Sequence, residues 1–234
     1  MVLCMKKITF YSEFVYIISL LILSFSVAMI SATDFGLSMI VSPAFILSQK
    51  LTFLTFGQAE YVVQGILFVV FCILMKRIRP VYFVSFGTGF IYGLMLDAWR
   101  LIIPHFNPEI TAPGSLPLAI RIVYFILGML LTSLSIAMCF RTYLYPQIYD
   151  FFVKGVSEKY SIDSGKFKTA YDFVFLIVSV VMSLLLFGKF VGVGIGTPVM
   201  AVCNGFVITF FGKIMDKIFV YKPLFKKFST YFEI

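Results

Sequence analysis

A few ionisable and amide side chains interrupt the long apolar stretches of this chain, and their types and spacing point to chemistry. Asp97 and Arg100 are three residues apart, so on a helix they share one face and can pair. Arg121, Glu60 and Gln64 are expected nearby, which predicts an outward-facing polar vestibule with two arginines for an acidic group. A charge at the bilayer centre costs about 2.5 to 3.5 kcal/mol. Each residue is therefore a candidate for binding a substrate or an ion.

A structural role for these residues is the alternative. Arg100 and Arg121 lie near the ends of their apolar stretches, so both guanidinium groups can reach the outer headgroups. Asp97 and Glu60 would then neutralise them and fix helix packing. Asp97 lies deeper than the arginines and is the first functional candidate of the set.

Thr88 and Asn204 are further polar candidates inside apolar stretches. An amide or hydroxyl on a membrane helix commonly forms a hydrogen bond to a neighbouring helix. Both residues are therefore candidates either for a ligand site or for helix packing.

Six apolar stretches must position these residues, each close to the ~20 residues that a helix needs to cross a ~30 Å hydrocarbon core. The stretches run over residues 10–32, 57–75, 81–103, 116–140, 169–186 and 197–213. Thr55 and Gln58 have the spacing of a capping box at the start of the second. With 61% hydrophobic and only 13% charged residues, the sequence predicts an all-α membrane protein in which residues 1–234 form a single transmembrane domain.

The charges sort by side of the membrane. If the N-terminus is cytoplasmic, fifteen Lys and Arg residues fall on the inner side and four on the outer side, as the positive-inside rule requires. This predicts a multi-pass protein with both termini in the cytoplasm and a basic cytoplasmic tail over residues 219–234 that lies on anionic headgroups. The net charge of +8 then needs no nucleic-acid partner.

The six stretches form two repeats, over residues 8–104 and 116–218. Each repeat has a short interrupted or amphipathic segment after its first helix. Three crossings are an odd number, so the second copy enters from the opposite side and the repeat is inverted. The matched positions are Gly57 with Gly165, Gly93 with Gly205, and Gln64 with Asp172.

The interrupted segments contain candidate re-entrant and hinge residues. Residues 39–50 are predicted to dip into the membrane or to lie at its outer interface, and residues 145–160 to lie in the inner interface. The turn before the sixth stretch is predicted to be a hinge or tight turn, with a nest of N–H groups for an anion as the alternative. The candidates of both halves are Gly36, Ser38, Pro43, Gly192, Gly194 and Gly196.

Five short segments follow one another in a characteristic order: TDFGLS at 33–38, LTFGQ at 54–58, GLMLD at 93–97, GKFVGVGIGT at 188–197 and AVCNG at 201–205. In these the chain resembles the YczE/YyaS/YitT group of bacterial polytopic membrane proteins. The resemblance covers most of residues 10–218. It implies the fold and a place in the bacterial cytoplasmic membrane, and it implies no substrate.

Enzymatic patterns are absent from the sequence. His105 is the one histidine, the four cysteines lack metal-ligand spacing, and there is no phosphate loop, so we expect no catalytic residue, metal or cofactor. The sequence predicts a small-solute secondary transporter or exporter, with the lipid bilayer and a small-molecule solute as partners; a homo-oligomer is left open. The alternative is a non-transporting scaffold or regulator that binds a partner protein at its basic inner face. A polar cavity near Asp97 would favour transport, and a dry interior with Asp97 paired would favour the scaffold.

Overall fold

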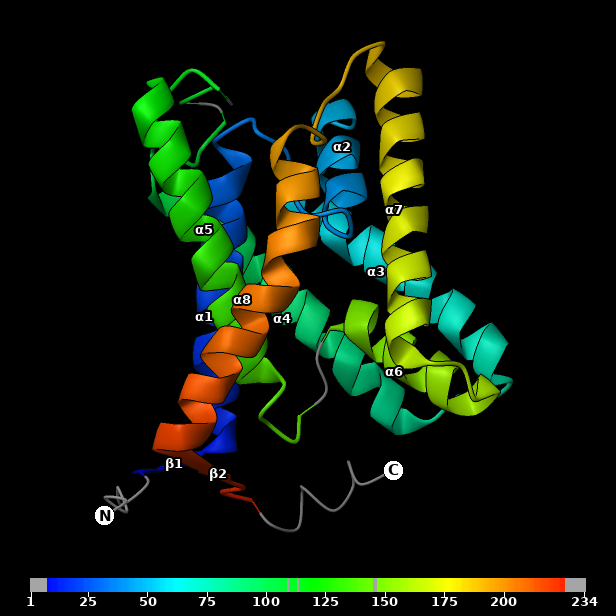
Figure 1. The fold of residues 1–234 in the computed structure, drawn as a ribbon. Coiled ribbons are helices and arrows are strands. Elements are labelled where there is room, and N and C mark those ends of the chain that lie inside the picture. Colours follow the sequence, from blue (N-terminus) through cyan, green and yellow to red (C-terminus); the bar gives the residue numbers. More distant parts are fainter. Residues whose placement is uncertain (1–7, 109, 113, 145–146, 226–234) are drawn as a thin grey trace.

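The structure is a computed structural model that describes residues 8–108, 110–112, 114–144 and 147–225. The described part is helical apart from two short strands (Figure 1). The elements in chain order are β1 (Ile8–Tyr11), α1 (Ser12–Ser31), α2 (Ser42–Lys50), α3 (Phe56–Met75), α4 (Pro80–Ile102), α5 (Leu118–Cys139), α6 (Ile148–Tyr160), α7 (Ser164–Phe187), α8 (Gly196–Ile218) and β2 (Phe219–Lys222).

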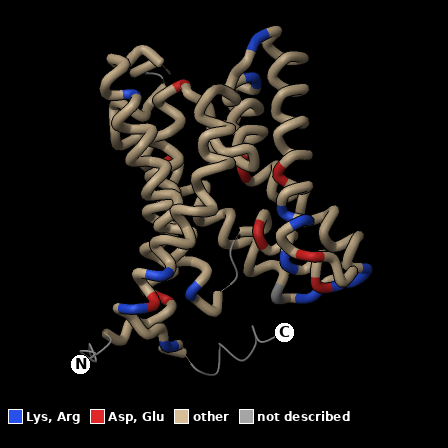
Figure 2. The backbone as a smooth tube through the Cα atoms, viewed as in Figure 1, with Lys and Arg blue, Asp and Glu red and all other residues tan. Residues whose placement is uncertain are grey.

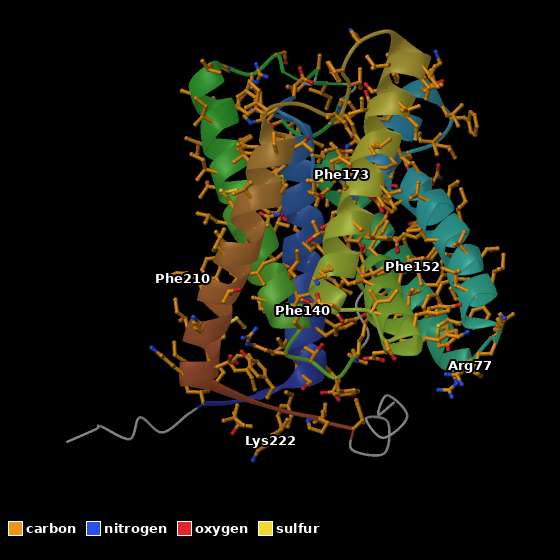
Figure 3. All side chains as sticks on the ribbon, turned by 45° about the vertical axis from the view of Figure 1, so that its right-hand side comes forward. Arg77, Phe140, Phe152, Phe173, Phe210 and Lys222 are labelled. Atoms are coloured by element: carbon orange, nitrogen blue, oxygen red, sulfur yellow. The ribbon has the colours of Figure 1, made fainter. Side chains whose placement is uncertain are left out.

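Five of these helices, α1, α3, α5, α7 and α8, are long and apolar enough to cross a bilayer. Their outer faces carry large exposed apolar side chains, such as Leu185 of α7 and Phe206 of α8, which suit contact with lipid. Phe210 lies on the outside of α8 in the same way (Figure 3). The chain is therefore a multi-pass membrane protein. Helix α4 has 23 residues but is not among the five, and its last turns contain Asp97 and Arg100.

The helices pack in a pattern that nearly repeats. Helix α1 packs along α5, α4 packs on α1, and α8 packs on α5. The short helices α2 and α6 each contact both α3 and α7. One contact breaks the match, because α3 lies along α4 whereas α7 and α8 stand apart (Figure 1).

Local chemistry fixes the starts of α3 and α7 in the same way. The predicted capping box is confirmed: the Thr55 hydroxyl accepts from the Gln58 N–H at 3.1 Å, and the Gln58 side chain accepts from the Thr55 N–H at 3.0 Å. At the start of α7, the Asp163 carboxylate accepts from the Lys166 N–H at 2.8 Å. Both caps satisfy a backbone donor that a helix otherwise leaves unpaired.

Helix α6 is more buried than a helix that packs on a surface with one face alone. Eight of its thirteen residues are buried, because α3, α4 and α7 cover it. Its place in the inner interface stays a prediction. The aromatic side chains Phe151 and Phe152 pack on Phe71 of α3, with ring centroids 5.0 and 5.9 Å apart.

The two strands bring the described ends of the chain together. Strands β1 and β2 pair in parallel, from Ile8 with Phe219 to Tyr11 with Lys222. Residues 10 and 11, predicted as the start of the first helix, belong to β1. The first part of the predicted tail forms β2, and residues 226–234 of that tail lie outside the described residues.

More Lys and Arg positions lie toward the end of the molecule where the strands lie than toward the opposite end (Figure 2). Arg77, at the turn between α3 and α4, lies at this same end as Lys222 (Figure 3). A few basic residues lie at the opposite end (Figure 2). The asymmetry has the form that the positive-inside rule gives to a membrane protein.

Candidate functional site

A partly open cavity of about 440 Å³ lies between the two halves of the molecule. It is lined by α1, residues 37–41, Tyr92 of α4, and residues of α5, α6, α7 and α8. Polar lining residues include Ser19, Thr132 and Asn204. The cavity occupies the space between α7 and α8, the two helices that stand apart where α3 and α4 touch.

Three charged side chains form an ionic group in the wall of the cavity. The Lys168 Nζ of α7 lies 3.1 Å from Asp172 Oδ1, one helical turn away, and 3.4 Å from Asp150 Oδ1 of α6. Each of these side chains is about one third exposed, at 34%, 30% and 29%. Two carboxylates around one ammonium leave a net negative charge, which favours a ligand that brings a positive group.

A second polar cluster lies directly behind this wall. The Tyr149 hydroxyl donates to Glu60 Oε2 at 2.9 Å, and Gln64 Nε2 donates to Glu60 Oε2 at 3.1 Å and to Gln147 Oε1 at 3.4 Å. Burial raises the pKa of Tyr149 well above its ordinary value, and the nearby Glu60 raises it further. Tyr149 therefore stays protonated and remains a donor.

The predicted repeat would relate these two clusters. At the offset that pairs Gly57 with Gly165, Glu60 is matched by Lys168 and Gln64 by Asp172. Each pair faces α6, through Tyr149 in the first half and Asp150 in the second. Among the described residues, no group of three or more His, Cys, Asp or Glu side chains is placed to hold a metal ion.

Asp97 lies away from the cavity and joins α4 to α3. Its Oδ1 accepts from the Gly57 N–H at 2.8 Å, and its Oδ2 accepts from the Thr55 hydroxyl at 2.5 Å. A carboxylate at a helix N-terminus satisfies free N–H groups and opposes the positive end of the helix dipole. Both oxygens therefore bond to α3, where the sequence predicted a pair with Arg100.

The two arginines have separate partners. The Arg100 guanidinium lies over the Phe56 ring, 5.3 Å from its centroid, and is buried. The Arg121 guanidinium lies 4.6 Å from the centroid of Phe35 and donates through Nε to the Thr33 carbonyl at 2.6 Å. The residues expected in one vestibule are thus distributed over different contacts.

Thr88 and Asn204 both join neighbouring helices. The Thr88 hydroxyl bonds to Tyr16 of α1 and donates to the Val84 carbonyl at 3.0 Å. Asn204 Oδ1 of α8 accepts from Ser133 of α5 at 3.3 Å. Of the two, Asn204 also lines the cavity.

The glycine candidates of the two halves pack against each other, Gly36 in the first half and Gly194 in the second. Gly36 has a φ of +97°, and a Cβ there would lie 2.4 Å from the Gly194 nitrogen. The Gly196 N–H donates to the Phe35 carbonyl at 2.7 Å, and Gly192 has a φ of +71°. The close approach and the positive φ values require glycine. The turn is a tight one packed against protein, and its Gly196 N–H is already engaged.

Ser38 and Pro43 lie at the start of the short helix of the first half. Ser38 lines the cavity, and Pro43 occupies the first turn of α2, where its missing N–H costs nothing. Most of α2 is buried between α3 and α7. Whether it enters the membrane from the outer side stays a prediction.

The sequence reasoning missed Gln147, Tyr149, Asp150 and Lys168 as site residues. Lys168 is one of the fifteen Lys and Arg residues that were assigned to the inner side, and Asp150 lies in the segment 145–160 that was predicted to lie in the inner interface. Neither residue was expected to line a cavity, because residues 145–160 were expected to lie at the surface of the protein. The available signal was the repeat offset, which pairs Glu60 with Lys168 and Gln64 with Asp172.

The cavity and Asp97 bear differently on the two predicted functions. A cavity with a partly polar lining is present, as transport requires, and Asp97 is paired, as the scaffold interpretation expects. Asp97 is not among the residues that line the cavity.

The architecture defines a class: a helical, multi-pass membrane protein with a charged cavity between two similar halves. The family of unknown function DUF6198 matches residues 10–213, so the chain belongs to that family. No curated protein and no solved structure matched the chain. The family match does not name the YczE/YyaS/YitT group, and that resemblance stays a prediction.

Proposed function

We propose that this protein is a secondary transporter of a small solute in the bacterial cytoplasmic membrane. The observation that carries the proposal is the charged cavity between the two halves, lined by Asp150, Lys168 and Asp172. Ionisable groups at membrane depth commonly mark a substrate or ion path. No catalytic residue, metal or cofactor has a part in the proposal.

Six crossings, with α4 as the sixth, are part of the proposal. The parallel pairing of β1 with β2 supports this number, because it brings the chain back to the end at which it starts. An odd number of crossings would leave the described ends on opposite sides. The basic residues at that end support a cytoplasmic location for both termini (Figure 2).

The order of helices supports two inverted three-helix repeats. Each half consists of a long helix, a short helix and two long helices, and the contact of α4 with α1 is matched by that of α8 with α5. In transporters built this way, the substrate site lies between the repeats, and access changes sides when the repeats exchange arrangements. We propose that the structure is the state in which α3 and α4 are closed and α7 and α8 are open.

The lining of the cavity narrows the class of solute. Its charged wall is net negative, and much of the rest, such as Leu20, Val27 and Met200, is apolar. This supports a small solute with a cationic or zwitterionic group and an apolar part.

The test is an untargeted comparison of metabolites inside and outside cells with and without the protein. We expect at least one solute to differ, and Lys168→Met to abolish the difference. Lys154→Met is the matched control, since Lys154 is exposed on α6 and should leave the difference intact. If no solute differs for the unchanged protein, the transport proposal fails.

That failure would favour a scaffold or regulator. The pairing of Asp97 with α3 and the basic end of the molecule support this second candidate. Its direct test is recovery of a partner protein by cross-linking at the basic end, lost when Arg77 and Arg79 are both changed to Gln.

A further inference from the structure

Glu60 is a buried acid without a counter-ion. Its side chain is fully buried in α3, and it takes part in no ion pair among the described residues. Its hydrogen-bond partners, Tyr149 and Gln64, are both neutral. A buried charge that is not compensated costs several kcal/mol, so the carboxylate requires a positive partner from outside the chain.

The unpartnered atoms around Glu60 show where that partner would lie. Glu60 Oε1 and Gln64 Oε1 are both buried and have no hydrogen-bond partner. Gln147 Nε2 is likewise unpartnered. Buried polar atoms of native proteins almost always have a partner. The two oxygens belong to residues one helical turn apart on α3, and a cation would satisfy such oxygens without needing a hydrogen-bond donor.

We infer that Glu60 binds a monovalent cation, a proton or a sodium ion, with the Gln64 amide oxygen as its second ligand. We further infer that this cation is the one coupled to transport; this second part rests on the proposed function, and the binding itself does not. The route is short, because Gln147 and Tyr149 bond to the Glu60 cluster and also line the cavity.

The site joins the two halves of the molecule. Glu60 and Gln64 belong to α3 of the first half, and Gln147 and Tyr149 belong to the segment of α6 in the second half. The bond of Tyr149 to Glu60 therefore crosses between the halves. Binding of a cation at Glu60 changes the charge at that junction, which is the place where it would bias their packing.

Among the residues that the structure describes, no other charged group around the site supplies the compensation. The titratable residues that face Glu60 are Tyr92 of α4 and Tyr149 of α6. Asp97 of α4 acts on the same Tyr92 and would add a negative charge. The one titratable residue of α2, Lys50, is exposed and donates to the Leu186 carbonyl.

The test is thermal unfolding of the purified protein in lipid nanodiscs, between about pH 5 and about pH 9, in choline chloride and in sodium chloride. A proton on Glu60 stabilises the folded state at low pH, and this stability is lost as pH rises. In choline we therefore expect the melting temperature to fall by several degrees toward high pH. Restoration by sodium at high pH identifies a sodium site, and no effect of sodium identifies a proton site.

Glu60→Gln should remove both responses, because a neutral amide mimics the compensated carboxylate. Its melting temperature at high pH should be at least that of the unchanged protein, so a folding failure is not expected. Glu158→Gln is the matched control, since Glu158 is exposed on α6, and it should keep both responses. If the unchanged protein and Glu60→Gln respond alike to pH and to sodium, the inference is wrong.

Two further variants separate the two cations. Tyr149→Phe removes a donor to the ionised carboxylate, so in the proton case the midpoint of the pH response should move upward. Gln64→Leu removes the amide oxygen, so in the sodium case the sodium concentration needed should rise at least about tenfold. These measurements do not depend on a transport assay, so a failure to find transport would leave this result intact.

Discussion

The two halves of the molecule have matching elements and opposite packing. In the first half, Gly57 of α3 and Gly93 of α4 lie so close that a Cβ on Gly57 would meet the Gly93 carbonyl oxygen at 2.1 Å. Their counterparts are Gly165 and Gly205, and a Cβ on Gly205 would meet nothing within 4 Å. The glycines therefore allow a close helix contact in the first half, and their counterparts in the second half make no such contact.

The glycine contacts of the first half are only partly available to the second. A Cβ on Gly89 of α4 would meet the Gln64 side chain at 1.9 Å, and the counterpart of Gly89 is Ala201, which carries a Cβ. Small residues let helices approach closely in a membrane. Under the proposed function, α7 and α8 would approach each other through Gly205, and the side chain of Asp172, the counterpart of Gln64, would have to shift to make room for Ala201.

The largest expected effect is a difference in stability between the variants Gly57→Ala and Gly165→Ala. Gly57→Ala places a methyl group against backbone and against Asp97 Oδ2 at 2.5 Å, and overpacking of this kind costs about 1 to 3 kcal/mol or more. Gly165→Ala, with its nearest neighbour at 3.4 Å, should be close to neutral. Thermal unfolding in nanodiscs measures both. Equal losses of stability in the two variants would contradict the difference between the halves.

The next largest effect on stability is expected for the ionic group of Lys168, Asp150 and Asp172 in the cavity wall. Lys168→Met leaves Asp150 and Asp172 without their shared cation, and we expect a loss of about 1 to 2 kcal/mol, which partial exposure keeps below the cost of a fully buried pair. Lys168→Met combined with Asp172→Asn should recover part of the loss. The same unfolding measurement decides, and a double variant less stable than the single one would argue against a shared interaction.

A smaller effect on stability is expected at Asp97, which joins α4 to the start of α3. Asp97→Asn loses an acceptor for the Thr55 hydroxyl, and loss of a cap costs about 1 kcal/mol. Its counterpart at the glycine offset is Thr209, which donates to the Gly205 carbonyl of its own helix at 2.8 Å, so Thr209→Val should change stability less. We expect Asp97→Asn to retain solute selectivity, as measured by metabolite comparison. If Asp97→Asn altered the set of solutes that differ between cells with and without the protein, Asp97 would belong to the solute-binding site.

The smallest effect is at the basic end, where Arg141 holds α8 against the end of α5. Its Nε and Nη2 each donate to an Asp216 oxygen at 2.7 Å, and this hydrogen bonding raises the pKa of Arg141. Asp216 is 59% exposed, so the pair contributes about 0.2 to 1 kcal/mol. Arg141→Lys should lower the melting temperature slightly, and less so in high salt. An effect independent of salt would indicate packing against Gly212 instead.

Local signals predicted much of the fold. The capping box at Thr55 and Gln58 marked the start of α3 correctly, because it depends on residues three apart. Apolar length marked the five helices that are long and apolar enough to cross a bilayer. The sixth crossing and the inverted order of the halves stay predictions. The pairing of β1 with β2 had no such signal, since it joins residues about two hundred positions apart.

The candidate site could be predicted only in part, because partners in space decide what a polar residue does. Glu60 and Gln64 were found from their places in an apolar stretch, but nothing local shows that they face Tyr149. Asp97 was expected to pair with Arg100 from spacing alone, and the N-terminus of α3 competes more strongly for its carboxylate. Nothing local distinguishes Lys168 from the other basic residues on the inner side, and only its position at the repeat offset from Glu60 sets it apart.

The most direct test of two halves in opposite arrangements is pulsed electron paramagnetic resonance on matched spin-label pairs in a cysteine-free background. The positions Ile66 with Phe90 report on α3 and α4, and their counterparts Val174 with Val202 report on α7 and α8; all four are well exposed. We predict a short, narrow distance distribution for the first pair and a longer one for the second. Changing pH or sodium should shift the two pairs in opposite directions. Two pairs with the same distance distribution, unchanged under every condition, would contradict the proposal.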